Sequence, residues 1–157
     1  MDTETGRLEP LSRADWLILT EAVALLGLAR LAVLALPFRW VMRAGGRHMA
    51  ESSKAVAPSD RAQVERVTWA IDTARLFTPW DSNCLAQTLS GARMLQRRGI
   101  ASTTYLGVAA ADPRGLGPHL SAHAWLRAGE DIILGDGRLD DYVSVASFAT
   151  GGQAEAE

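Results

Sequence analysis

The stretch Thr78-Pro79-Trp80-Asp81-Ser82-Asn83-Cys84-Leu85-Ala86-Gln87 holds the only cysteine of the 157-residue chain. Proline, aspartate, serine and asparagine predict a loop as far as Asn83, and either Ser82 or Asn83 can cap a helix. Cys84 opens that helix, which we expect to continue to about Arg98. The thiol therefore lies in the first turn of a helix that follows a loop.

Cys84 has a position that suits a nucleophile. The N–H groups of a first helical turn lack partners within the helix, and together with the helix dipole they favour a thiolate. The same N–H groups can stabilise an oxyanion. A second donor can come from Gln87, Asn83 or the Trp80 indole, and the residues do not decide among these three. The alternative is a buried, inert cysteine, which is a common state of a free thiol.

A histidine lies in the predicted strand Ser121–Arg127. Side chains alternate along a strand, so His123, Trp125 and Arg127 share one face. A lone cysteine with histidine and aspartate elsewhere in the chain is a candidate nucleophile. The order of cysteine on a helix and histidine on a later strand is the layout of papain-like or transglutaminase-like thiol enzymes.

An aspartate follows the next predicted strand. A two-residue turn at Gly129-Glu130 pairs residue 128 with residue 131, and the same register pairs residue 123 with residue 136. Asp136 would then lie beside His123 and orient its imidazole, which is the role of the third group in a triad. Asp131 competes for this role, but turn chemistry explains it better. The predicted catalytic residues are thus Cys84, His123 and Asp136.

Neither a metal nor a cofactor is expected. One cysteine and three scattered histidines lack the spacing of zinc ligands. A thiolate acting with a histidine needs no further group for acyl transfer.

Length and charge favour one small soluble domain. A chain of 157 residues can bury a core of its own. Its net charge of −2 gives no electrostatic reason to expect a nucleic-acid partner. A single cysteine forms no internal disulfide, so nothing points to an oxidising compartment, and we expect a cytoplasmic protein.

Residues 16–36 form an unusually apolar segment that is long enough to span a bilayer. Glu21 and Arg30 argue against a span, because each charge costs roughly 2.5–3.5 kcal/mol at mid-membrane. The preceding residues are acidic rather than basic, so the segment does not resemble a signal peptide.

We expect this segment to be a long helix wrapped by the rest of the domain or by a partner. Asp15 can cap its start, and Pro37 should end or kink it. The alternative is weak association with a membrane surface, since Arg39, Arg43 and Arg47 follow the apolar run.

The remaining pattern predicts an α+β fold. Asp60 and Gln63 have the spacing of a capping box, which predicts a helix start at Ser59-Asp60. The expected elements are a helix to about Phe77, strands at Ile100–Val108, Ser121–Arg127 and Asp131–Leu134, a loop at Ala109–Leu120 and a last strand or turn at Tyr142–Phe148.

Two motifs together resemble a known family. Asn83-Cys84-Leu85-Ala86-Gln87 and Ala122-His123-Ala124-Trp125, followed by Gly-Asp, resemble the transglutaminase-like leader peptidases of lasso-peptide biosynthesis. The apolar helix that ends in Leu36-Pro37-Phe38-Arg39 is also typical of them. The likeness extends from about Trp16 to Phe148.

The resemblance implies a fold with N-terminal helices and a catalytic cysteine at a helix N-terminus, packed on a small antiparallel sheet that carries His and Asp. It implies a flexible N-terminus at residues 1–15, a single peptidase domain at 16–148 and a disordered tail at 149–157. By position, Cys84 is the nucleophile, His123 the general base and acid, and Asp136 the orienting acid.

The resemblance also implies a cysteine protease that cuts the leader from a ribosomally made precursor peptide. Few residues precede Trp16, so we expect a stand-alone form that works with a separate leader-recognition protein and passes the core peptide to a lasso cyclase. The alternatives are amide transfer to an amine by the same residues, and a non-catalytic adaptor in a peptide-maturation complex with an inert Cys84.

Overall fold

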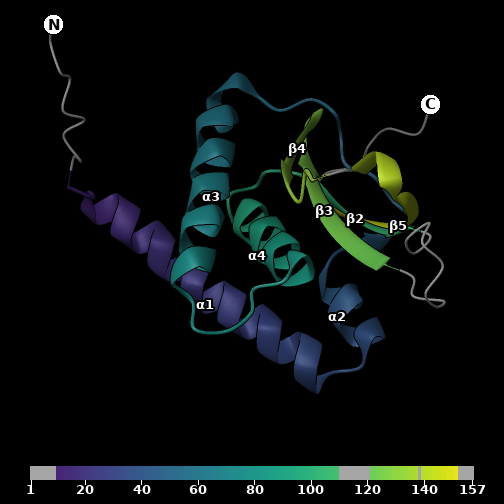
Figure 1. The fold of residues 1–157 in the computed structure, drawn as a ribbon. Helices are drawn as coiled ribbons and strands as arrows, with labels where there is room; N and C mark the ends of the chain where they lie inside the picture. The colour runs from purple at the N-terminus through teal and green to yellow at the C-terminus, as the bar shows by residue number, and fades with distance from the viewer. Residues whose placement is uncertain (1–9, 110–120, 138, 152–157) are drawn as a thin grey trace, which may run out of the picture.

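The computed structural model describes residues 10–109, 121–137 and 139–151, in which helices pack on an antiparallel sheet (Figure 1). The described helices are α1 (Arg13–Ala35), α2 (Phe38–Ala44), α3 (Pro58–Phe77) and α4 (Cys84–Arg97). The strands are β1 (Arg47–His48), β2 (Ser102–Ala109), β3 (Ser121–Ala128), β4 (Asp131–Leu134) and β5 (Val143–Thr150), with a 3-10 turn η1 (Leu139–Asp141) before β5. The predicted α+β class is confirmed.

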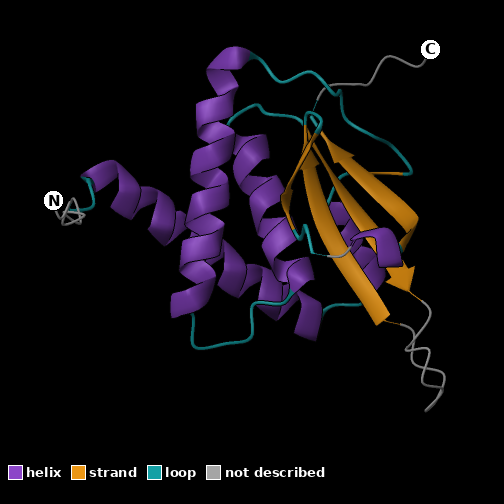
Figure 2. Cartoon of the chain, turned by 45° about the horizontal axis from the view of Figure 1, so that its top comes forward, coloured by secondary structure: helices purple, strands orange, loops and turns teal. Residues whose placement is uncertain are grey.

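Helix α4 is the central element of the fold. It contacts α1 and α3 on one side and β2, β3 and β4 on the other. Figure 2 shows the three long helices α1, α3 and α4 on one side and the sheet on the other. The strand order is β1-β5-β2-β3-β4. Because α4 is covered from two sides, its buried residues include Thr88, Ser90 and Met94, whereas Leu85 and Leu89 are only half-buried.

A glycine brings α4 close to the sheet. A Cβ atom on Gly91 would lie 2.5 Å from Leu134 Cδ1 and 2.9 Å from Leu126 Cδ2. Real Cβ atoms essentially never come that near to another heavy atom, so any other residue at position 91 would have to displace these two leucine side chains. Leu126 is fully buried and Leu134 nearly so.

Replacing Gly91 with alanine should therefore destabilise the fold. Alanine normally favours a helix interior over glycine by about 0.5–1 kcal/mol. Here we expect overpacking to outweigh that gain and to lower the free energy of unfolding by about 1–3 kcal/mol, measured by urea denaturation. Gly137→Ala is the control, because a Cβ there has no neighbour within 4 Å. Equal stability of Gly91→Ala and the parent chain would show that the two leucines give way.

Helices α1 and α3 begin differently from the prediction. Ser12 caps α1 and Asp15 is the third helical residue, where its carboxylate completes a capping box; Asp15 is therefore not the cap itself. The Ser12 hydrogen bonds lower the pKa of Asp15. Helix α3 starts at Pro58 after Ala57, with no side-chain cap, so the predicted capping box of Asp60 is wrong. Proline is preorganised for a first helical position, where an N–H would have no partner in the helix.

Helix α1 is not wrapped by the domain. It ends before Pro37 as predicted, and Ile18, Ala22 and Leu26 are its buried residues. It is the one described helix whose length and composition would allow it to cross a membrane. Only 22% of its 18-residue apolar stretch is buried. Covering by the rest of the domain is thus wrong, and most of the apolar surface of α1 is exposed in this chain; covering by a partner stays a prediction.

The pairing of β3 with β4 follows the predicted register only next to the turn between them. Ala128 pairs with Asp131 and Arg127 with Ile132, but the register then shifts and Leu126 pairs with Leu134. This shift leaves one extra residue on β4, which is a β-bulge. The predicted register that opposed residue 123 to residue 136 is therefore wrong.

The C-terminal strand is longer than predicted. Strand β5 includes Ala149 and Thr150, which the sequence assigned to a disordered tail. Thr150 is buried and its hydroxyl lies 3.0 Å from that of Ser102 on β2. The rest of the predicted tail from residue 152, and residues 110–120 of the predicted loop, lie outside the described residues.

Candidate active site

Cys84 is the first residue of α4, as predicted. Asn83 is the cap, and its Oδ1 accepts a hydrogen bond from the Ala86 N–H at 3.0 Å. The Gln87 N–H is bound by the Asn83 carbonyl. Among the described residues, the N–H groups of Cys84 and Leu85 have no hydrogen-bond partner. The half-buried thiol thus stands beside two free backbone donors at the positive end of a helix dipole.

The three predicted oxyanion donors hold the loop before α4. Gln87 Nε2 donates to the carbonyl of Ser82, and Asn83 uses its side-chain oxygen as the helix cap. The Trp80 ring packs against Gly27 of α1, where a Cβ would lie 3.3 Å from Cζ2. Trp80 Nε1 is buried and has no partner among the described residues. The choice of a second oxyanion donor stays a prediction.

His123 lies near the beginning of β3, opposite Gly107 of β2. Its Nε2 is 2.9 Å from the carbonyl oxygen of Gly135. Because a carbonyl only accepts, Nε2 carries the proton in this contact and Nδ1 is the nitrogen left for another partner. The ring also packs on Tyr142 and Trp125, with centroids 5.2 Å and 6.1 Å away. Glycine at position 107 leaves room for the Trp125 ring.

Cys84 and His123 occupy the same end of two layers. Both α4 and β3 have their first residues at the lower of their two ends in Figures 1 and 2. Leu126 faces α4 next to Gly91, and alternation sends His123 to the other face of β3. Among the described residues, no hydrogen bond joins the Cys84 sulfur to the imidazole. The described contacts thus do not include a thiol–imidazole pair.

Asp136 follows β4 and is exposed. The bulge in β4 and the left-handed conformation of Gly135, with φ of 75°, bring the Gly135 carbonyl to His123 in place of the carboxylate. No hydrogen bond between Asp136 and His123 is present in the described part of the chain. The orienting role of Asp136 stays a prediction that the structure does not test.

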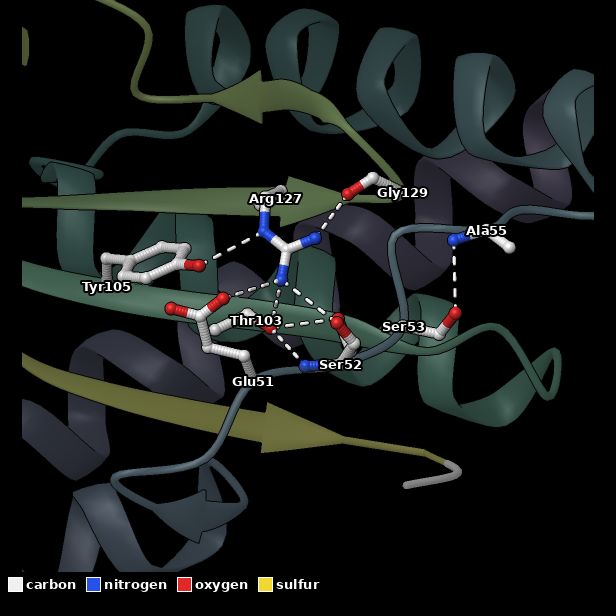
Figure 3. Close-up of polar contacts among 8 residues, drawn as sticks. All are labelled: Glu51, Ser52, Ser53, Ala55, Thr103, Tyr105, Arg127 and Gly129. Carbon is white, nitrogen blue, oxygen red and sulfur yellow. Dashed lines mark hydrogen bonds and ion pairs between the residues drawn. The ribbon is translucent and has the colours of Figure 1, made fainter. Parts of the chain in front are cut away.

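The structure contains a buried arginine whose role the sequence did not indicate (Figure 3). Arg127 is 6% exposed, and its guanidinium donates to Tyr105 Oη at 3.1 Å, to the Ser52 carbonyl at 3.0 Å and to the Gly129 carbonyl. It also lies 3.4 Å from a Glu51 carboxylate oxygen. These contacts hold the segment before α3 against the sheet.

Tyr105 is part of the same cluster. Burial raises the pKa of its phenol, and the hydrogen bond from Arg127 partly opposes that rise. The ring stacks on Trp125, with centroids 5.6 Å apart. This arrangement keeps the phenol neutral as an acceptor for the guanidinium. The only sequence signal was the placement of Arg127 on the same strand face as His123.

Removing the guanidinium should destabilise the chain more than removing a surface arginine. Arg127→Met leaves the carbonyls of Ser52 and Gly129 without their donor, and we expect a loss of about 3 kcal/mol in the free energy of unfolding. Arg75→Met, which removes an exposed ion pair with Asp72, should cost less than about 1 kcal/mol. Urea denaturation of both variants tests this difference; equal losses would contradict the clamping role.

A groove of about 970 Å³ lies between α3 and β4. Its walls are residues 54–56, α3 side chains from Arg61 to Asp72, and residues 128–136. Acidic side chains outnumber basic ones in the lining: Glu65, Asp72, Glu130, Asp131 and Asp136 against Lys54 and Arg61. One end is formed by Gly135 and Asp136, so the groove reaches the carbonyl that binds His123.

Strand β4 is an edge of the described sheet, because β3 is its one neighbour in the strand order. Backbone groups on the outer side of an edge strand are free to pair with an added strand.

In the described residues, no group of three or more His, Cys, Asp or Glu side chains could hold a metal ion.

Comparison with known proteins identifies the class to which this fold belongs. Residues 32–147, which are more than half of the chain, match the family model of the transglutaminase-like superfamily. The chain belongs to the transglutaminase-like superfamily, which usually contains cysteine peptidases or transglutaminases. No curated protein and no solved structure matches the chain.

Proposed function

We propose that this protein is a cysteine peptidase that removes the leader from a ribosomally made lasso-peptide precursor. It would act in the cytoplasm with a separate leader-recognition protein and a lasso cyclase. The main support is the placement of Cys84 as the first residue of α4, beside two backbone N–H groups without partners. Membership of the transglutaminase-like superfamily and the Cys and Ala-His-Ala-Trp motifs agree with this proposal.

The proposed reaction follows from the residues. The Cys84 thiolate attacks the carbonyl carbon at the junction between leader and core, and the Cys84 N–H binds the oxyanion. The C–N bond then breaks, and His123 gives its proton to the leaving amine, which becomes the N-terminus of the core. Water attacks the acyl-enzyme, His123 takes its proton, and the leader leaves with a free carboxylate.

The proposal requires the imidazole to meet the thiol during turnover. In the free chain, His123 is hydrogen-bonded to Gly135 at one end of the groove beside β4. An extended peptide could add to the edge of β4 as a further strand and reach this end of the groove. The acidic excess of the lining favours uncharged or basic residues in the bound segment. Binding there would place the peptide next to the Gly135–His123 contact.

Cleavage of the precursor should depend on three residues. With the recognition protein present, Cys84→Ala should abolish release of the leader, and His123→Ala should lower the rate by at least about 100-fold. Asp136→Asn should lower it by about tenfold or more. Asp131→Asn is the matched control, because Asp131 is also exposed and lines the same groove. Full activity of Cys84→Ala would contradict the mechanism, and equal rates of the two aspartate variants would exclude Asp136. Product masses distinguish hydrolysis from transfer to an amine.

A non-catalytic adaptor is the second candidate, and one observation favours it. The His123 ring is engaged with Gly135 and, among the described contacts, does not hydrogen-bond the thiol. In an adaptor, Cys84 would have only a packing role.

Thiol reactivity separates the two candidates without a substrate. If Cys84 and His123 act together, iodoacetamide should alkylate Cys84 below pH 8 about tenfold faster than a free thiol, because a paired cysteine is more fully ionised. His123→Ala should remove that advantage. The measurement is made with and without the recognition protein. Slow alkylation that His123→Ala does not change under either condition would support the adaptor.

A further inference from the structure

Helix α1 exposes large apolar side chains near both of its ends. Trp16, Leu17, Leu28, Leu31 and Leu34 are 60%, 74%, 61%, 63% and 66% exposed. At ~100° per residue these positions fall on one side of the helix, opposite the buried side chains that pack on α3 and α4. Large contiguous apolar patches on a folded surface mark interaction sites.

The apolar face continues beyond the helix. Leu36, Phe38 and Trp40 at the start of α2 are 51%, 57% and 56% exposed. Together with the five residues of α1 they are called the apolar surface below. Most of α1 lies before residue 32, where the superfamily match begins. Half of the eight residues of this surface, Trp16, Leu17, Leu28 and Leu31, therefore lie outside the matched region.

Charges around the apolar surface are basic. Arg39, Arg43 and Arg47 are exposed and follow α1, although the whole chain has a net charge of −2. Glu21 is the one acidic residue between positions 16 and 50. It faces α4, where Arg98 binds it at 2.8 Å and Arg97 at 3.4 Å. Within residues 16–50, the one carboxylate is thus held by arginines at the end of α4, and the exposed charges that follow α1 are basic.

A pocket adjoins the apolar surface. It has a volume of about 240 Å³ between α1, α2 and α4, and Leu28, Leu36 and Trp40 line it. Ser90 also lines it, and its buried hydroxyl has no partner among the described residues. A mainly apolar pocket that shares residues with an apolar surface suits a hydrocarbon chain.

We propose that α1 and the start of α2 form a docking surface for an anionic lipid bilayer. The helix would lie in the interface and would not span it, because α1 packs on α3 and α4 along its other side and Glu21 is paired with α4. The apolar surface enters the acyl region, the three arginines bind anionic headgroups, and the pocket receives part of an acyl chain. The partner is thus a membrane surface, and this inference is independent of the proposed peptidase activity.

Co-sedimentation of the full chain with lipid vesicles tests the proposal. Vesicles of phosphatidylcholine alone are compared with vesicles that also contain phosphatidylglycerol. We expect stronger binding to the anionic vesicles, and weaker binding at high salt. Leu31→Glu/Leu34→Glu should lower the partition coefficient by about 100-fold, since two exposed leucines no longer enter the lipid. Val143→Glu/Val145→Glu on β5, where the valines are 70% and 54% exposed, is the control and should bind normally.

A second measurement keeps the test independent of sedimentation. Brominated lipid should quench Trp16 or Trp40 fluorescence, and Trp16→Phe/Trp40→Phe should lose that quenching while the other tryptophans do not respond. Circular dichroism confirms that each variant is folded. Absence of binding to anionic vesicles, or unchanged binding of Leu31→Glu/Leu34→Glu, would overturn the proposal. Binding of the recognition protein to the apolar surface, with no binding of the chain to either type of vesicle, would also overturn the proposal. Equal binding to both vesicle types would overturn the role of the arginines.

Discussion

The close packing of α4 on the sheet is the constraint on which the rest of the structure depends. Gly91 permits it, because any Cβ there would collide with Leu126 and Leu134. Helices α1 and α3 then cover the other side of α4, so one helix organises both layers. The N-terminus of the same helix carries Cys84. Core packing and the placement of the candidate nucleophile therefore both depend on α4.

A second constraint acts on the opposite face of the sheet. Arg127 is buried there and holds residues 51–52 and the turn at Gly129 through charge-assisted hydrogen bonds. Its aromatic neighbours continue along the strand to His123. The face that carries the histidine is thus built as one polar and aromatic unit. Cys84 belongs to the helical layer, so a reaction at Cys84 and His123 would combine groups from the helical layer and from this face of the sheet.

The molecule has two surfaces of different chemistry. The groove beside β4 is rich in acidic groups and lies next to His123, whereas α1 and α2 offer an apolar surface followed by arginines. These two surfaces have opposite chemistry and suit different partners. A peptidase docked on a membrane through one surface would keep the other free for its substrate.

The sequence by itself determined the local features of this protein. A cap at Ser82 or Asn83, the start of α4 at Cys84, the strand alternation at His123 and the tight turn before Asp131 follow from short-range rules; the structure has all four and selects Asn83 as the cap. Only the tertiary structure decided the bulge in β4, the contact of the Gly135 carbonyl with His123, the burial of Arg127 and the exposure of α1. Pairing registers and burial depend on contacts between residues far apart in the chain, and no local pattern specifies those contacts.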